Sequence, residues 1–171
     1  GQIMASDSAL LVRSGGNFEV LDPSSGNTLR TIEAGGYDTL LADGRLFVAV
    51  NDTLNAYDIS TGATLWSATL PDYVSLIIAN SDYVVTRYST YNPNINAYES
   101  YITAFAAAAG NQLSSTLFPE AQMSSSSTVL RDGELFLATR VYSDTGRTDS
   151  IEALNLNSGL RRSLLTDEDK E

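Results

Sequence analysis

Short apolar segments alternate with turn residues along the whole chain. The stretch LNAYDISTGATLW (Leu54–Trp66) shows the pattern: an apolar run reaches Asp58, a turn follows at Ser60-Thr61-Gly62, and a second run ends at the only tryptophan. Segments of this length, rich in β-branched and aromatic residues and bounded by Gly, Asp, Asn or Ser, predict β-strands. In the surrounding unit we expect four strands, at about residues 39–42, 45–51, 53–57 and 64–70. No segment predicts a helix of useful length.

The same strand–turn–strand pattern occurs four times. Its other copies are FEVLDPSSGNTLRTI (18–32), ITAFAAAAGNQLSSTL (102–117) and IEALNLNSGLRRSLL (151–165). The turn glycines are Gly26, Gly62, Gly110 and Gly159, at intervals of 36, 48 and 49 residues. Repeats of about 40 residues with four strands each are typical of β-propeller blades. We therefore expect an all-β fold of four four-stranded antiparallel blades, at about residues 3–38, 39–74, 75–126 and 127–165, followed by an acidic tail or linker at 166–171.

The turn residues have structural roles in this interpretation. The chain must reverse direction at Gly62 with a positive φ, which a Cβ would disfavour. Asp22 and Asp58 can accept hydrogen bonds from backbone N–H groups of their own turns. Asp-Gly at 43–44 and 132–133 predicts tight hairpin turns. Trp66 is expected to pack between adjacent blades.

The best-preserved unit resembles the quinoprotein-like (PQQ-like) β-propeller repeat. Ala56, Asp58, Thr61, Gly62 and Trp66 match that family's A-x-D-x-x-T-G-x-x-x-W pattern. The first unit matches it in part and has arginine where tryptophan is expected, and it also resembles the related YVTN-type repeat. The later units keep only the alanine and the glycine.

The resemblance implies further properties. Family members usually close with seven or eight blades, so four blades imply part of a larger propeller, a closed small one, or a fragment flanked by other domains. The chain begins Gly1-Gln2 without an initiating methionine, and we expect a piece of a longer protein. The family's enzymes are quinone-dependent dehydrogenases, which bind quinone and calcium through residues not visible here. Its larger, non-catalytic branch includes outer-membrane assembly lipoproteins and surface propellers that act as binding platforms.

The amino-acid composition limits the kinds of catalytic site, metal site and partner that the chain can have. The chain contains no cysteine and no histidine, and its only lysine is Lys170. A cysteine nucleophile, a Ser-His-Asp triad and a histidine metal site are therefore excluded. The net charge of −11 disfavours nucleic acid as a partner. No apolar run approaches the roughly 20 residues that a membrane-spanning helix needs. An acidic surface fits an extracytoplasmic protein, whether periplasmic, secreted or on the cell surface.

Functional variation in propellers is expected where the repeat is interrupted. The third unit has an insertion, YSTYNPNINAYESY (88–101), and the fourth has a shorter one, RVYSDTGRTDS (140–150), at the equivalent place. Because equivalent hairpins project from one side of adjacent blades, we expect the two to form a ridge. Tyrosine with asparagine is a composition typical of recognition surfaces. The candidate partner-binding residues are Tyr88, Tyr91, Asn92, Asn94, Tyr98, Tyr142 and Arg147. Asp144 and Asp149 supply too few oxygens for a calcium site.

These observations favour a non-catalytic binding or scaffold module that recognises a protein or glycan through the extended hairpins. No catalytic residue, cofactor or metal is expected. Two alternatives stay open: a fragment of a quinone-dependent oxidoreductase, and a structural segment that self-assembles with a second copy or a cognate propeller half.

Overall fold

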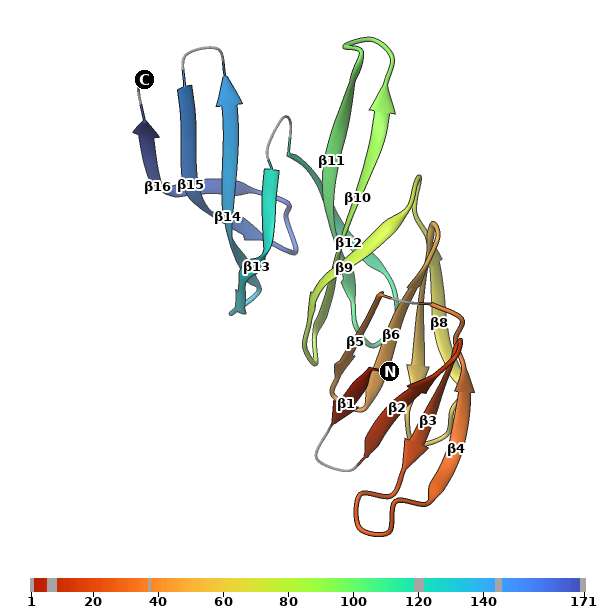
Figure 1. The fold of residues 1–171 in the computed structure, drawn as a ribbon. Coiled ribbons are helices and arrows are strands. Elements are labelled where there is room, and N and C mark those ends of the chain that lie inside the picture. Colours follow the sequence, from red (N-terminus) through yellow and green to blue (C-terminus); the bar gives the residue numbers. More distant parts are fainter. Residues whose placement is uncertain (1, 6–8, 37, 119–121, 144–145, 170–171) are drawn as a thin grey trace.

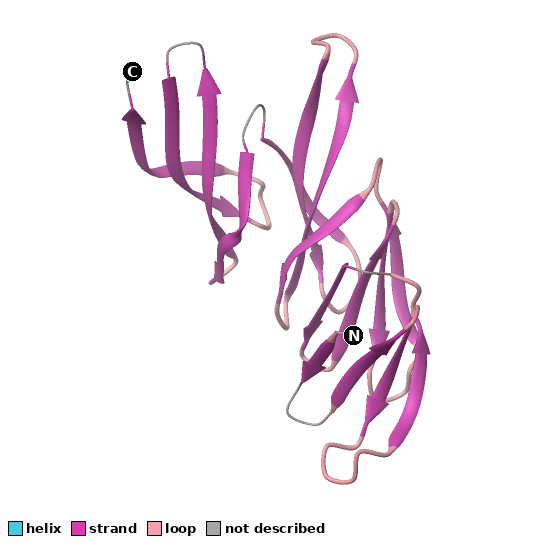
Figure 2. Ribbon diagram, in the orientation of Figure 1, coloured by secondary structure: helices cyan, strands magenta, loops and turns pink. Residues whose placement is uncertain are grey.

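The computed structural model describes residues 2–5, 9–36, 38–118, 122–143 and 146–169. In this part of the chain there are sixteen strands and no helix (Figure 2). The strands form four antiparallel four-stranded sheets, each built from consecutive strands. The predicted all-β fold of four blades is therefore confirmed.

The four blades follow one another in chain order. Blade 1 contains β1 (Ile3–Ala5), β2 (Leu10–Ser14), β3 (Asn17–Leu21) and β4 (Thr28–Glu33). Blade 2 contains β5 (Asp38–Ala42), β6 (Arg45–Val50), β7 (Thr53–Asp58) and β8 (Thr64–Thr69). Blade 3 contains β9 (Val74–Ala79), β10 (Tyr83–Asn92), β11 (Ala97–Ala106) and β12 (Gln112–Phe118). Blade 4 contains β13 (Gln122–Arg131), β14 (Glu134–Ser143), β15 (Gly146–Asn155) and β16 (Arg161–Asp169).

The blades form an open series, with blade 1 and blade 4 at opposite ends (Figure 1). The first strands of blades 2, 3 and 4 are neighbours, because β9 contacts both β5 and β13. A side chain also joins two of these strands: the backbone N–H of Leu76 donates to Asp38 Oδ2 at 2.7 Å.

The apolar cores lie between consecutive blades. Alternation along β6 shows how this arises, since successive side chains of a strand point to opposite faces. Leu46 and Val48 enter the core shared with blade 1, whereas Phe47 and Ala49 enter the core shared with blade 3. We call the face turned toward the next blade the front face, and the face turned toward the preceding blade the rear face. A third core joins blades 3 and 4.

The recurrent turns have the predicted geometry. Gly62 has φ +78° and the other three turn glycines have φ between +71° and +73°. Asp58 Oδ1 accepts hydrogen bonds from the backbone N–H groups of Ser60 and Thr61, at 2.7 and 2.8 Å. Hydrogen bonds from Ser60, including one from its hydroxyl, and from Thr61 hold the pKa of Asp58 below its ordinary value. Asp22 forms the same contacts in blade 1.

One hydrogen bond recurs at each joint between blades. Its donor is the side chain four residues after the turn glycine, and its acceptor is a backbone carbonyl three residues before the turn glycine of the next blade. The bonds are Arg30 Nη1 to Ile59 O at 2.7 Å, Trp66 Nε1 to Ala107 O at 3.0 Å, and Ser114 Oγ to Leu156 O at 2.6 Å. Trp66 therefore lies between blades, as predicted, and its ring also contacts Phe47 and Phe105.

The insertion in blade 3 forms an extended hairpin, in which β10 and β11 are ten residues each. The bounds of blade 4 differ from the sequence expectation. The last strand continues to Asp169, through most of the expected tail, because the lengthened β15 offers it backbone partners as far as the pair Arg147 and Asp169. Blade 4 likewise begins at Gln122 rather than at residue 127.

Candidate recognition surface

The longest hairpin of blade 3 is formed by β10 and β11. Its strands pair without a shift from Tyr83 and Ala106 to Asn92 and Ala97. The outer half extends beyond the rest of the blade, because β9 pairs with β10 only as far as Tyr88. The hairpin thus carries its turn away from the body of the molecule (Figure 1).

The turn at the end of this hairpin is held by its own polar groups. Asn96 has a φ of +54°, a conformation that asparagine tolerates better than most residues. Asn92 Oδ1 accepts a hydrogen bond from the backbone N–H of Asn94 at 3.0 Å. The hydroxyl of Tyr91 donates to Asn96 Oδ1 at 2.5 Å. The asparagines therefore shape the turn, and Tyr91 is fixed in position by one of them.

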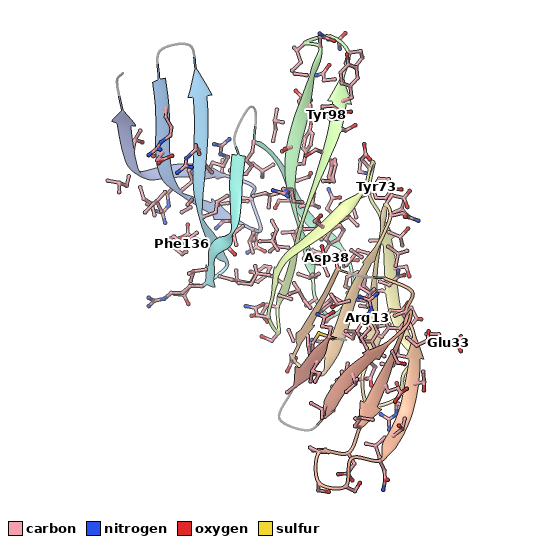
Figure 3. All side chains as sticks on the ribbon, in the orientation of Figure 1. Arg13, Glu33, Asp38, Tyr73, Tyr98 and Phe136 are labelled. Carbon is pink, nitrogen blue, oxygen red and sulfur yellow. The ribbon has the colours of Figure 1, made fainter. Side chains whose placement is uncertain are left out.

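Three large side chains remain exposed around this turn. Tyr98 is 69% exposed, Ile95 58% and Tyr91 48%. The two tyrosine rings form an edge-to-face pair with centroids 5.5 Å apart, and Figure 3 shows Tyr98 on the upper part of the hairpin. We call Tyr91, Ile95 and Tyr98 the tyrosine tip. No charged residue lies between residues 88 and 98, although the chain carries a net charge of −11.

Tyr88 occupies a different environment from the tip. It is only 8% exposed and belongs to the core between blades 2 and 3. Its ring stacks on that of Tyr101 at 5.0 Å. The Tyr101 hydroxyl donates to Glu99, and partial burial together with this carboxylate raises the pKa of Tyr101. Of the four tyrosines in the insertion, the structure thus brings two to the surface and places Tyr88 in the core.

The hairpin of blade 4 carries a group of charges. Asp149 Oδ1 accepts from Arg140 Nε at 2.7 Å, and Asp149 Oδ2 lies 2.9 Å from Arg147 Nη2. The bond from Arg140, followed by the charges of both arginines, lowers the pKa of Asp149. The side chain of Tyr142 and the whole of Asp144 lie outside the described residues. Arg147 is therefore engaged with a carboxylate of its own hairpin.

The two hairpins extend to the same side of the molecule from neighbouring blades, as expected, but the paired strands β10 and β11 stand apart from β14 and β15 at their outer ends in Figure 1. Their key side chains also face different ways. Tyr91 and Tyr98 follow the alternation of Val85 and Ile102, which point toward blade 4. Arg147 and Asp149 follow the alternation of Ile151, on the front face of blade 4. The structure therefore does not unite Arg147 with the tyrosine tip in one surface.

Sequence reasoning did not include Ile95 in the candidate surface. The sequence did point to Ile95, because it stands between two asparagines at the centre of the insertion, where a turn is expected rather than a core position. Among the described residues there is no group of three or more metal-ligating side chains. No helix in that same part of the chain is long and apolar enough to cross a membrane.

The geometry of the four sheets defines a set of β-propeller blades. No family model matches the chain, and no curated protein matches it significantly. Solved structures do match. The europium-containing methanol dehydrogenase superimposes with a TM-score of 0.58 and 13% identity, over 94% of this chain and 40% of the enzyme.

Two further solved structures also superimpose on this chain at low sequence identity. Dihydro-heme d1 dehydrogenase NirN, in complex with DHE, has a TM-score of 0.61 and 15% identity over 98% of this chain and 37% of its own. A complex of KlAtg21 with the coiled coil of AgAtg16 has a TM-score of 0.59 and 15% identity, covering 93% and 53%. The methanol dehydrogenase and NirN are β-propeller proteins, so the likeness establishes the fold alone. The chain spans about half of these structures or less.

Proposed function

We propose that this chain is a non-catalytic β-propeller binding module that recognises a protein or a glycan through the tyrosine tip. The observation that carries the proposal is the exposure of Tyr98, Ile95 and Tyr91 at the end of a long, regularly paired hairpin. Large apolar side chains gathered at an exposed site are a common mark of interaction surfaces.

The tip is suited to recognition because it is held in shape before binding. A tyrosine side chain has few rotatable bonds and loses little entropy when it is immobilised. Tyr91 is restrained further by its hydrogen bond to Asn96 and by the ring of Tyr98. Preorganisation of this kind lowers the cost of association.

The kind of contact follows from the chemistry of the tip. Tyrosine rings stack on sugar rings as readily as they fill apolar pockets of proteins, and asparagine side chains can hydrogen-bond either partner. The tip carries no charge, so affinity should depend little on ionic strength. We extend the proposal to an extracytoplasmic location, which the acidic composition supports.

The experiment is a binding screen of the 171-residue chain against an oligosaccharide array and a display library of folded protein domains. Each hit is then measured with Tyr98→Ala and with Tyr73→Ala. Tyr73 is a matched control, because it is equally exposed (72%) but lies between β8 and β9, outside the tyrosine tip. We expect Tyr98→Ala to weaken binding at least about tenfold, as at an interface hot spot, and Tyr73→Ala to leave it unchanged. Equal effects of the two changes on every hit would contradict the proposal.

A further inference from the structure

The front faces of the blades share one set of positions. At one level of this face, the four strands of a blade contribute one side chain each. In blades 1 to 3 these side chains are Met4, Leu11, Phe18 and Ile32; Leu40, Phe47, Leu54 and Ala68; and Ile78, Val85, Ile102 and Thr116. All except Thr116 belong to the core with the next blade or pack against it. The hydroxyl of Thr116 donates to the backbone of the next blade at Gly159.

Blade 4 has large apolar residues at all four of these positions: Val129, Phe136, Ile151 and Leu165. Three of these four residues are exposed and Phe136 is half-buried. Val129 and Leu165 are each 59% exposed and Ile151 is 43% exposed, whereas the counterparts of Ile151, Leu54 and Ile102, are fully buried. Figure 3 shows Phe136 on blade 4, on the side away from blade 3. This face has the composition of a blade–blade core without the second blade.

The opposite end of the series presents the complementary surface. The rear face of blade 2 places Leu46, Tyr57 and Ile59 in or against the core with blade 1. The corresponding residues of blade 1 are Leu10, Leu21 and Pro23. They are apolar as well, and Leu10 and Leu21 pair with each other on the face opposite to that of Leu11. Blade 1 lies at the far end of the series from blade 4 (Figure 1).

The recurrent hydrogen bond between blades has counterparts at both ends. The donor position, four residues after the turn glycine, is Ser163 in blade 4, and its hydroxyl lies 3.0 Å from Thr166 Oγ1 in its own strand. Serine already serves as this donor at Ser114. The acceptor position, three residues before the turn glycine, is the carbonyl of Pro23 in blade 1.

We propose that the front face of blade 4 binds the rear face of blade 1 of a second copy of this chain, so that two copies join head to tail. Both halves of the interface are present on one chain, but they lie at opposite ends of an open series. A twofold axis lets two copies satisfy both ends at once, and closed symmetry of this kind is the usual form of homo-oligomers. Two sets of four blades give eight, which is within the range of propeller rings.

The first test is the mass of the 171-residue chain in solution, measured by light scattering over a wide range of concentration. We expect a species of twice the 18.3 kDa chain mass. Ile151→Asp places a charge in the proposed interface at a residue that is already partly exposed, and should yield a monomer with an unchanged circular dichroism spectrum. Tyr73→Asp, at an exposed tyrosine outside the interface, should remain a dimer. A monomeric parent chain, or a dimer indifferent to Ile151→Asp, would overturn the proposal.

The second test establishes the head-to-tail arrangement. The chain has no cysteine, so Ser163→Cys and Pro23→Cys each introduce a single thiol. When the two variants are mixed and treated with a short bismaleimide, the cross-linked product should contain one copy of each variant. Cross-linking of Ser163→Cys with itself would show that like faces meet, and would overturn the arrangement. Loss of ligand binding by Tyr98→Ala, with the dimer intact, separates this proposal from that of the tyrosine tip.

Discussion

Gly110 lies against the only tryptophan of the chain, and a methyl group there should be costly for two separate reasons. Its φ is +72°, and a Cβ built on it would lie 2.5 Å from Cδ2 and 2.7 Å from Cε3 of Trp66. The indole cannot easily withdraw, because Phe47 and Phe105 flank it and its Nε1 donates to Ala107 O. Gly110→Ala therefore acts on the joint between blades 2 and 3.

The magnitude can be worked out by comparison with a second turn glycine. Gly26 has nearly the same φ, +71°, but a Cβ there would meet nothing within 4 Å. Gly26→Ala should thus lower the free energy of unfolding only by the cost of holding alanine in the left-handed conformation, about 1 kcal/mol. Gly110→Ala carries that cost and an overpacking cost of about 1 to 3 kcal/mol. We expect the free energy of unfolding to fall by about 2 to 4 kcal/mol, and by about 1 kcal/mol in the control.

The assay is urea unfolding followed by circular dichroism, which does not depend on the tryptophan. Both alanine variants are also made in a Trp66→Ala background, where the clash is removed. There the cost of Gly110→Ala should fall to that of Gly26→Ala. Equal costs in the parent chain, or a difference that persists without the indole, would refute the role assigned to Trp66.

Two further predictions concern the same turns. Hydrogen bonds from Ser60 and Thr61 lower the pKa of Asp58 from its ordinary 3.8. The ionised Asp58 therefore stabilises the fold above about pH 4, and this contribution is lost as the pH falls through the lowered pKa. Asp58→Asn should flatten the dependence of the free energy of unfolding on pH between about 2 and 4, and parallel curves for the variant and the parent chain would contradict this. Trp66→Phe removes the donor to Ala107 O and should lower the free energy of unfolding by about 1 to 3 kcal/mol, measured by urea unfolding; a change within error would show that the carbonyl does not need this bond.

The parts of the fold that could be predicted from the sequence are those encoded locally. The turn that ends at Gly62 can be recognised from Asp58 and the glycine, because both residues lie within the five residues that form it. The turn before Gly110 has Ala106 in place of the aspartate, yet the backbone bond from Gly110 N to Ala106 O is kept at 2.8 Å. There the repeat was identified from Gly110 together with Ala104 and the apolar strands on either side.

The candidate surface was harder to predict because it depends on how far the strands pair and on which side chains a neighbouring blade buries. The insertion was expected to form an extended hairpin, but the sequence alone does not show how far its two strands pair or which side chains point outward. Tyr88 and Tyr91 look equivalent in the sequence, but they are three residues apart in a strand and so point to opposite faces. Blades 2 and 4 pack on the two faces of blade 3, but Tyr91 lies beyond the last paired residues of β9 and β10. The assembled fold therefore places Tyr88 in the core and Tyr91 at the surface.

The bonds that join the blades also bear on how such a chain can change over time. Arginine, tryptophan and serine all serve as the donor, whereas the acceptor is in every case a main-chain oxygen. A substitution in the receiving blade alters a side chain but leaves that oxygen in place as long as the turn keeps its shape. Successive blades can therefore diverge in sequence, be duplicated or be exchanged without a matching change in their neighbours. The same hydrogen bond can join blades whose sequences differ.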